Sequence, residues 1–489
     1  MYFLIKFIEA CNCALCYNKL VFLVMLLTIP AFTDNDLNFE QNLLHWWEII
    51  LLPIYFFLLV KIGKRYYDKK FPLGTDRKLF INGLKIKMLG SIFITLIYNL
   101  YYSGGDTTAY FNDGRLLDKI LFHEPATAVR MFFVSGYTDS WPDNLLNIAW
   151  DFRMPFAANT WIIVKISAFF SLFCFQSMLC VSLFFAFFSY LCIWRFYITL
   201  ISMYPDVKKK LSIVIIFVPS VIIWGSGIFK DTVTLSSMLL LFCIVHQLFF
   251  EKKKIVKNIL LAGICCWLLY VVKDYIFFSF SISMAIWLLL SWGFSVKAKF
   301  LRVLFLFFIV STAAISSFIM INYIGKEIAE IAVKDLLERT VLTGQYLHAV
   351  SERTEGSSYD IGVAEPTLQG FITIAPKAVN VTLFRPYLWE SGKLIIFLSA
   401  LESTLILLYF IFVLLKNKII FFFTKIGKDP FLLFCIFFTL IFAIFVGVSS
   451  FNFGNLVRYK IPCIPFFLTA LVVLDGKVKK EKKTVLAVV

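Results

Sequence analysis

Long apolar segments recur along the whole chain, and they limit its fold more than any other feature. Of the 489 residues, 60% are hydrophobic, only 16% are charged, and 57 are phenylalanine. Soluble domains average about 45–50% apolar and about 25% charged residues, so a soluble fold of this composition would lack the polar surface to cover its core. Disorder is excluded too, because the chain has abundant apolar surface to bury. We expect an all-α polytopic membrane protein.

About twelve of these segments are candidates for membrane-spanning helices, which need about 20 apolar residues each. The first follows the N-terminus without a small-residue cleavage site, so we expect a retained anchor instead of a removed signal peptide. The segments lie at residues 18–33, 45–61, 88–103, 178–200, 211–226, 232–250, 258–272, 275–293, 301–322, 394–415, 430–450 and 461–474.

The connectors between the segments alternate in charge. Six of them, including the C-terminal tail, together hold 28 Lys and Arg against 7 Asp and Glu, whereas the alternate connectors hold 15 against 21. Because Lys and Arg accumulate in cytoplasmic loops, the basic connectors and both termini are expected in the cytoplasm. The same rule explains the net charge of +16 without a nucleic-acid partner. We expect a multi-pass protein of the bacterial cytoplasmic (inner) membrane.

Residues 159–200 break this alternation. They join an outer connector to an inner one, which requires an odd number of crossings, yet they are long enough for two spans. The polar side chains of this stretch fall in its first half. We therefore predict one span at 178–200 that is preceded by an in-plane or re-entrant helix at about 158–177 on the outer surface.

Five regions follow from this organisation. Two long extracytoplasmic loops, 104–158 and 323–393, separate the groups of spans, and the second loop begins with a helical pattern. The regions are a two-span anchor with a basic cytoplasmic loop at 1–87, a membrane core at 88–322, the second outer loop at 323–393, a C-terminal three-span unit at 394–475, and a basic cytoplasmic tail at 476–489.

Charged side chains at the outer ends of spans are the most informative polar residues, because charge at membrane depth is costly and usually serves function or pairing. The first is Asp106, which follows Gly104 and Gly105 directly after the third span. Two glycines allow a tight turn off a helix end, and this turn holds Asp106 near the membrane surface. Asp106 could alternatively cap the next helix, and the two roles are compatible.

Two short outer hairpins carry the next charges. Lys230 and Asp231 end the first hairpin, where Lys230 could instead be a snorkelling cation at the interface. Lys273 and Asp274 form the second, which a neutral salt-bridged turn would explain.

Three more cations lie near the outer ends of late spans. Arg385 ends the second long loop, and Arg458 and Lys460 lie between the last two spans, against the positive-inside rule. Glu402 lies well inside a span, and there we expect a polar partner with a structural role.

Together these residues suit a reaction with a phosphorylated lipid. A carboxylate can accept the proton of an acceptor hydroxyl, and cations at membrane depth can hold a lipid-linked phosphate. Other chemistries lack their motifs, since the chain has no phosphate-binding Gly-x4-Gly-Lys-Ser/Thr loop, no His-Glu-x-x-His and no Gly-x-Ser-x-Gly. Cys11, Cys13 and Cys16 lack a fourth metal ligand nearby. No cofactor is assigned, and a divalent metal is left open.

At these residues the chain resembles the GT-C superfamily of integral membrane glycosyltransferases and the related bacterial polysaccharide polymerases of O-antigen type. The resemblance covers roughly residues 88–475 and rests on a short ordered set of motifs. One departure is that two spans, not one, precede the loop with the acidic residue. The motifs are Gly104-Gly105-Asp106-Thr107-x-x-Tyr110, the surface helix, Pro219 to Asp231, and Arg458-Tyr459-Lys460-Ile461-Pro462.

The resemblance implies an inverting glycosyltransferase that uses a sugar on a polyprenyl phosphate as donor and acts at the extracytoplasmic face. Asp106 would be the general base, and the acceptor would be a glycan, a lipid or a protein. The donor phosphate would contact Lys230, Arg385, Arg458 and Lys460. Secondary or acceptor contacts would come from Tyr110, Asp113, Asp118, Asp231 and Lys273.

Two alternatives remain. A polymerase of O-antigen type would use the same face and cations to join lipid-linked repeat units, and its product would be a ladder of lengths. A transporter or flippase of lipid-linked saccharides would instead carry charges along a cavity at the middle of the membrane. Apart from Glu402, the centres of the spans are poor in charge.

Overall fold

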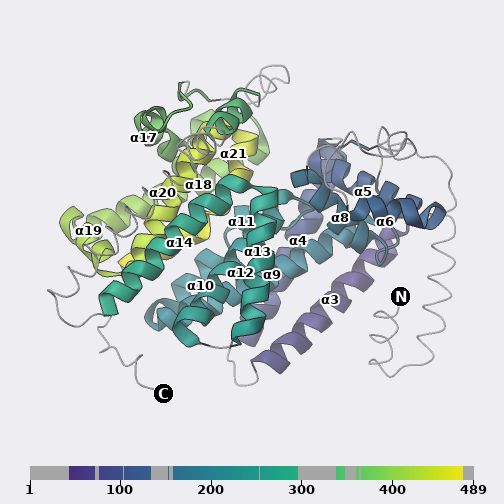
Figure 1. Ribbon diagram of the computed structural model, residues 1–489, viewed down its shortest axis with the longest axis horizontal. Helices are drawn as coiled ribbons and strands as arrows, with labels where there is room; N and C mark the ends of the chain where they lie inside the picture. Colours follow the sequence, from purple (N-terminus) through teal and green to yellow (C-terminus); the bar gives the residue numbers. More distant parts are fainter. Residues whose placement is uncertain are drawn as a thin grey trace, which may run out of the picture. The chain divides into compact units, whose positions relative to one another are not determined.

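The computed structural model shows a helical protein. It describes residues 43–71, 76–102, 104–133, 152–153, 158–252, 254–295, 337–346, 359–362 and 365–476, and these residues form no β-strand (Figure 1). Seven of the described helices are long and apolar enough to cross a membrane, and an eighth crossing is possible if the bent pair Phe453–Tyr459 and Ile464–Asp475 counts as one span. The described part of the chain is therefore that of a polytopic helical membrane protein, as predicted.

The seven helices coincide with seven of the predicted segments, and the bent pair coincides with the segment at 461–474. The segment at 45–61 differs, because its helix continues to Lys70 through the charged residues of the following connector. The seven helices are Arg77–Tyr101, Met178–Met203, Lys230–Glu251, Ile255–Val272, Asp274–Gly293, Ile395–Asn417 and Pro430–Ser450.

The predicted segment at 211–226 is not one continuous helix. Helix α10 (Lys208–Ile216) ends before an extended residue, Val218, and α11 (Pro219–Trp224) begins with the proline itself. Proline disfavours a helical conformation in the residue before it, which explains the break. The Glu402 carboxylate accepts the N–H of Ser220 at 2.7 Å, in the first turn of α11. The predicted polar partner of Glu402 is thus a backbone N–H that the start of α11 leaves available.

The contacts between residues divide the protein into two compact units. Unit 1 comprises residues 1–188 and 226–232, and unit 2 comprises 189–225 and 233–489. The described helices of unit 1 are α3 (Glu48–Lys70), α4 (Arg77–Leu96), the π-helical turn η1 (Ile97–Tyr101), α5 (Asp106–His123), α6 (Pro125–Phe133), α8 (Ala158–Ser171) and the first part of α9 (Met178–Met203).

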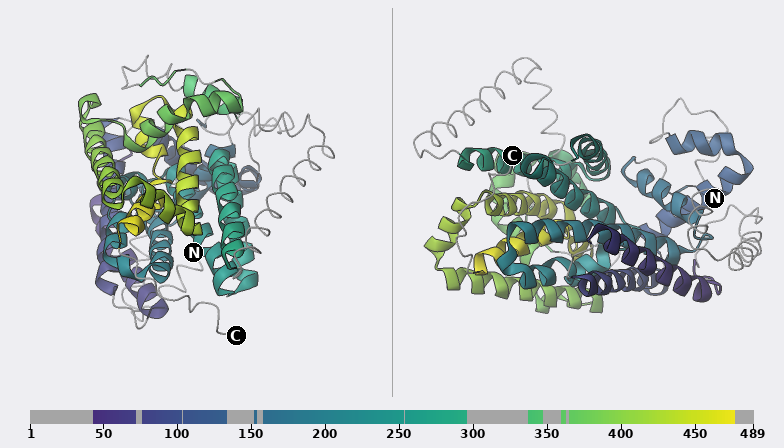
Figure 2. Two further views of the ribbon diagram at one scale, coloured as in Figure 1. Left: turned by 90° about the vertical axis from the view of Figure 1, so that its left-hand side faces the viewer. Right: turned by 90° about the horizontal axis from the view of Figure 1, so that it is seen from below.

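Unit 1 is built on two helix pairs, α3 with α4 and α5 with α8 (Figures 1 and 2). Buried polar contacts tie its segments together. Ser177 donates to the Glu48 carboxylate at 2.5 Å, and Thr95 donates to Ser182 at 2.8 Å. The predicted helix at 158–177 is present as α8, which a turn at residues 172–176 separates from α9. Its position on the outer surface of the membrane stays a prediction.

Unit 2 has an aromatic core. The Phe242 ring stacks on Trp287 at 5.1 Å and on Phe434 at 5.8 Å between centroids, and Phe466 meets it edge-on. Besides the rest of α9, α10 and α11, its helices are η2 (Pro205–Val207), α12 (Lys230–His246, from residue 233), η3 (Gln247–Glu251), α13 (Ile255–Val272), α14 (Asp274–Ser295), α17 (Leu368–Phe384), η4 (Leu388–Glu390), α18 (Leu394–Asn417), α19 (Ile419–Lys428), α20 (Pro430–Ser450), α21 (Phe453–Tyr459) and α22 (Ile464–Asp475).

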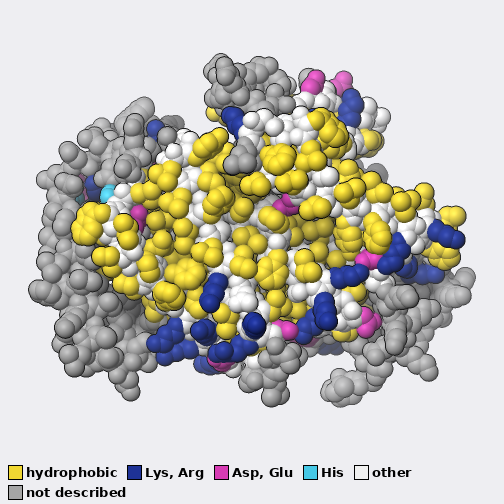
Figure 3. All heavy atoms as spheres, turned by 180° about the vertical axis from the view of Figure 1, so that it is seen from behind, with side chains coloured by type: hydrophobic (Ala, Val, Ile, Leu, Met, Phe, Trp, Pro, Cys, Tyr) yellow, Lys and Arg dark blue, Asp and Glu magenta, His cyan; other side chains and the backbone are white. Residues whose placement is uncertain are grey.

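Hydrophobic side chains make up most of the described face drawn in Figure 3, as a lipid-facing surface requires. Several predicted features lie outside the described residues, so the structure does not bear on them. They are the anchor segment 18–33, the Cys11–Cys16 group, the apolar segment 301–322, most of the second outer loop before residue 359 except the helical stretch 337–346, and the tail from residue 477.

Close helix packing in unit 2 yields a stability prediction. A Cβ on Gly447 of α20 would lie 2.6 Å from the Ala378 carbonyl oxygen of α17, and a backbone atom cannot move aside as a flexible side chain can. We expect Gly447→Ala to cost about 1–3 kcal/mol, the range typical of overpacking. A lowered melting temperature of the purified protein in detergent would reveal this cost.

The matched control is Gly263→Ala in α13, where a Cβ meets no described atom within 4 Å. Alanine is the better helix former, so this variant should melt at or slightly above the wild-type temperature. Equal melting temperatures for the two variants would contradict the close approach of α17 and α20.

Candidate functional site

The turn after α4 places Asp106 at the start of a helix. Gly104 and Gly105 have φ values of +137° and +135°, in the region that glycine adopts without strain. The N–H of Gly104 donates to the Tyr98 carbonyl at 2.9 Å, and α5 then begins at Asp106. Gly105, not Asp106, therefore occupies the N-cap position, and the Asp106 carboxylate lies in the first turn, where negative charge is favourable.

One aromatic ring connects this turn with the Lys230 hairpin. A Cβ on Gly105 would lie 2.7 Å from the Tyr98 ring, so the ring lies directly against the Gly105 backbone. The same ring meets Phe229 edge-on, with 5.3 Å between centroids. Asp106 and Lys230 each follow a residue that touches Tyr98. Unit 1 therefore brings the predicted base and one predicted phosphate ligand to the same end of α4.

The Lys230 hairpin is fixed locally. Thr232 donates its hydroxyl hydrogen to the Gly227 carbonyl at 2.8 Å. A Cβ on Gly227 would collide with the Phe229 ring at 2.6 Å, so this position also depends on glycine. Lys230 is half-buried and begins α12, and Asp231 beside it is buried.

Three further predicted site residues, Tyr110, Asp113 and Asp118, are buried on α5. In unit 1, this helix packs against α8. The Asp113 carboxylate accepts the Arg153 N–H at 3.1 Å. Asp118 is 1% exposed, and its Oδ2 atom has no hydrogen-bond partner among the described residues.

The surroundings of Asp118 are polar but incompletely paired. The hydroxyls of Ser167 and Ser171 on α8, and the side-chain nitrogen of Gln176, also lack partners within the described part of the chain. Burial raises the pKa of Asp118 well above its ordinary value, and the positive charge of Arg115 offsets only part of this shift. On α8, burial lowers the pKa of Lys165 to about 8. Such perturbed groups are typical of functional sites, although structural polar networks produce them as well.

In unit 2, Arg385 occupies a closed environment. It ends α17, and its guanidinium makes a two-pronged contact with Glu390, in which Nε donates to Oε2 at 3.0 Å. Aromatic rings surround the cation, which is the arrangement of a cation–π box. Their centroids lie 5.2–5.9 Å from Cζ and belong to Phe453, Tyr359 and Tyr387.

Lys460 is tied to the same place. Its ammonium donates to the Arg385 carbonyl at 3.0 Å and to the Ser403 hydroxyl at 2.7 Å, and the side chain is 1% exposed. The neighbouring Tyr459 ring lies 4.0 Å from the Lys273 ammonium, and Arg458 is buried next to it. Four predicted cations of unit 2 thus lie around α21, whereas Asp106 and Lys230 belong to unit 1.

Sequence reasoning missed the residues that organise both groups. Tyr98 is one of 21 tyrosines and follows an apolar segment, so no pattern distinguishes it. Ser403 reaches Lys460 only through tertiary packing. Glu390 follows Arg385 by five residues, so their closeness in the sequence could have suggested this ion pair.

Among the residues that the structure describes, no three His, Cys, Asp or Glu side chains are grouped as a metal ion would require. No known protein family, curated protein or solved structure matches the chain.

Burial of Asp118 predicts a pH-dependent stability. Its pKa is higher in the folded than in the unfolded state, so the folded state holds a proton that the unfolded state releases above about pH 4. Stability should therefore fall as the pH rises from about 4 through the folded-state pKa. In detergent, Asp118→Asn should flatten this part of the profile of melting temperature against pH.

The matched control is Asp206→Asn, which changes an exposed aspartate and should leave the wild-type profile intact. A wild-type melting temperature that rises through this range, or an Asp118→Asn profile that matches the wild type, would contradict the buried neutral carboxyl.

Proposed function

We propose that the protein is a membrane glycosyltransferase that transfers a sugar from a polyprenyl-phosphate-linked donor to an acceptor at the extracytoplasmic face of a bacterial cytoplasmic membrane. The observation that carries the proposal is the contact of Tyr98 with both Gly105 and Phe229. This contact gives a carboxylate and a cation a common location at one end of an apolar helix. The charge asymmetry of the connectors supports an extracytoplasmic location for that end.

In the proposed reaction, an acceptor hydroxyl attacks the anomeric carbon of the donor sugar. A new C–O bond forms as the bond between the anomeric carbon and the phosphate oxygen breaks, and polyprenyl phosphate leaves with the electron pair. Asp106 takes the hydroxyl proton as general base, and its half-exposed position leaves it accessible to an acceptor. Lys230 balances the negative charge that develops on the departing phosphate.

The unit 2 cations Arg385 and Lys460 also make contacts within the protein. The Arg385 guanidinium is already engaged by Glu390, and the Lys460 ammonium is engaged by Ser403 and by a carbonyl. A phosphate would have to compete with these contacts. Their substitution would therefore perturb the fold of unit 2 together with any role in binding.

The first test concerns the base. In cells that lack the chain, complementation with Asp106→Asn should abolish the glycan product that the wild type restores, because an amide cannot take up the proton. Asp360→Asn is the control, since Asp360 is exposed and an amide oxygen can still accept the Gly362 N–H. Mass spectrometry of the lipid-linked and surface glycans measures the product, and immunoblotting confirms equal expression. Full product from Asp106→Asn would refute its role.

The second test concerns the phosphate. Lys230→Gln should weaken binding of polyprenyl phosphate to the purified protein by roughly ten- to hundredfold, since a charge-assisted contact contributes about 1.5–3 kcal/mol. Native mass spectrometry can compare this variant with Lys377→Gln, which removes an exposed lysine of α17. Equal loss of affinity in both variants would indicate a general charge effect and contradict a specific contact.

A further inference from the structure

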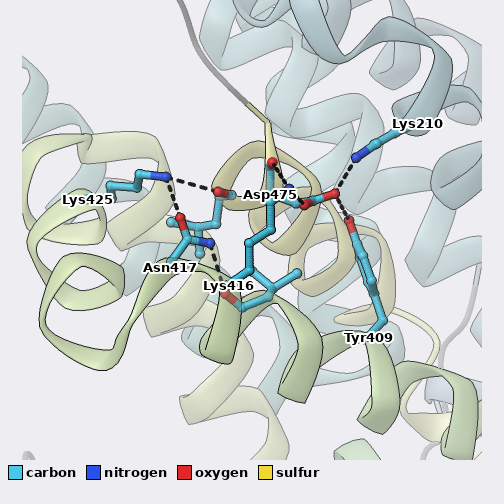
Figure 4. A network of polar contacts seen from close by, with 8 residues as sticks. Lys210, Tyr409, Lys416, Asn417, Lys425 and Asp475 are labelled. Carbon is cyan, nitrogen blue, oxygen red and sulfur yellow. Dashed lines mark hydrogen bonds and ion pairs between the residues drawn. The ribbon is translucent and has the colours of Figure 1, made fainter.

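The basic end of unit 2 carries a group of lysines near one buried carboxylate. Asp475 ends α22, and its side chain is only 3% exposed. Lys210 of α10 and Lys416 of α18 both contact its carboxylate, and the Tyr409 hydroxyl donates to it at 3.3 Å (Figure 4). Three helices of unit 2 therefore meet at one aspartate.

A third lysine joins the group from α19. The Lys425 ammonium donates to the Leu474 carbonyl at 3.2 Å and also contacts Asn417, as Figure 4 shows. Lys416 additionally donates to the Asp475 backbone carbonyl at 3.0 Å. Two ammonium groups thus contact one carboxylate, and a third binds the backbone carbonyl of the preceding residue, so the group carries an excess of positive charge.

This excess positive charge is exposed at the protein surface. The Lys210 and Lys416 side chains are 52% and 44% exposed, although each contacts Asp475. Two further carboxylates, Asp429 and Asp206, form no ion pair with these lysines within the described residues. Asp429 accepts hydrogen bonds from Tyr204 and from the Phe431 N–H, and Asp206 is exposed on η2.

Helix α19 adds exposed apolar side chains beside these lysines. Its ten residues span about 15 Å, too short for a hydrocarbon core of about 30 Å. Phe422 and Ile426 face the protein, while Ile420 and Phe423 are 79% and 63% exposed. Exposed apolar side chains beside Lys418, Lys425 and Lys428 are typical of a helix that lies in the interface plane.

We propose that the surface formed by Lys210, Lys416, Lys425 and α19 binds the headgroup of an anionic phospholipid in the cytoplasmic leaflet. The ammonium groups match the charge of a phosphodiester, and the exposed face of α19 contacts the acyl chains beside it. Basic pockets between membrane helices on the cytoplasmic side are suited to such headgroups. The single Asp475 carboxylate only partly offsets the lysines, so a net positive charge remains for the lipid.

The test measures lipid retention by native mass spectrometry of the full-length protein with phosphatidylglycerol or phosphatidylcholine of the same acyl chains. Wild type should prefer phosphatidylglycerol, and Lys416→Gln/Lys425→Gln should reduce this preference by roughly tenfold. The control Lys252→Gln/Lys254→Gln removes two exposed lysines from another basic connector and should keep the preference. An equal loss in both variants would overturn the proposal.

Three measurements do not depend on the folding of the double variant. Raising the salt from 50 to 500 mM should weaken retention of phosphatidylglycerol by wild type, and 10 mM inorganic phosphate should not displace it, because phosphate lacks the acyl chains. Asp475→Asn should retain at least the wild-type preference, since it removes only negative charge. Displacement by phosphate would assign the surface to a free anion and overturn the lipid proposal, as would salt-insensitive retention or loss of the preference in Asp475→Asn.

Discussion

A hydrocarbon layer offers no hydrogen-bond partners, and this constraint shapes the described structure. Backbone groups are satisfied within helices, and several polar side chains near apolar segments find partners in the protein. Glu402 is one example, because one of its carboxylate oxygens accepts a backbone N–H at the start of α11. Proline ends one helix and begins another there, and a glutamate from α18 supplies the acceptor that the break requires.

The same constraint makes the ends of spans the natural places for chemistry. The two glycines before α5, the Tyr98 ring and the hairpin before α12 together form a rigid corner in unit 1. Under the proposed function, this corner would hold a carboxylate and an ammonium where a lipid-linked phosphate and a soluble acceptor could both reach them. In unit 2, Arg385 and Lys460 bind protein groups around α21.

Segment length and hydropathy were sufficient to predict the class of fold and seven of the long apolar helices, because a spanning helix must be long and apolar whatever its neighbours are. They failed at 211–226, where the average composition hides the break before Pro219. They also placed the end of the 45–61 segment too early, since a helix need not stop where its charged residues begin. For the candidate site, sidedness led to Asp106 and Lys230, but the Tyr98 contact that joins their loops depends on tertiary packing.

The central claim is that Asp106 and Lys230 flank one lipid phosphate at the outer end of α4. The most direct measurement is a cryo-EM structure of the full-length protein in a lipid nanodisc with bound polyprenyl phosphate. We expect density for the phosphate within contact distance of the Lys230 ammonium, with the Asp106 carboxylate facing the same space. Phosphate density at another part of the chain, or an Asp106 side chain turned away from Lys230, would contradict the claim.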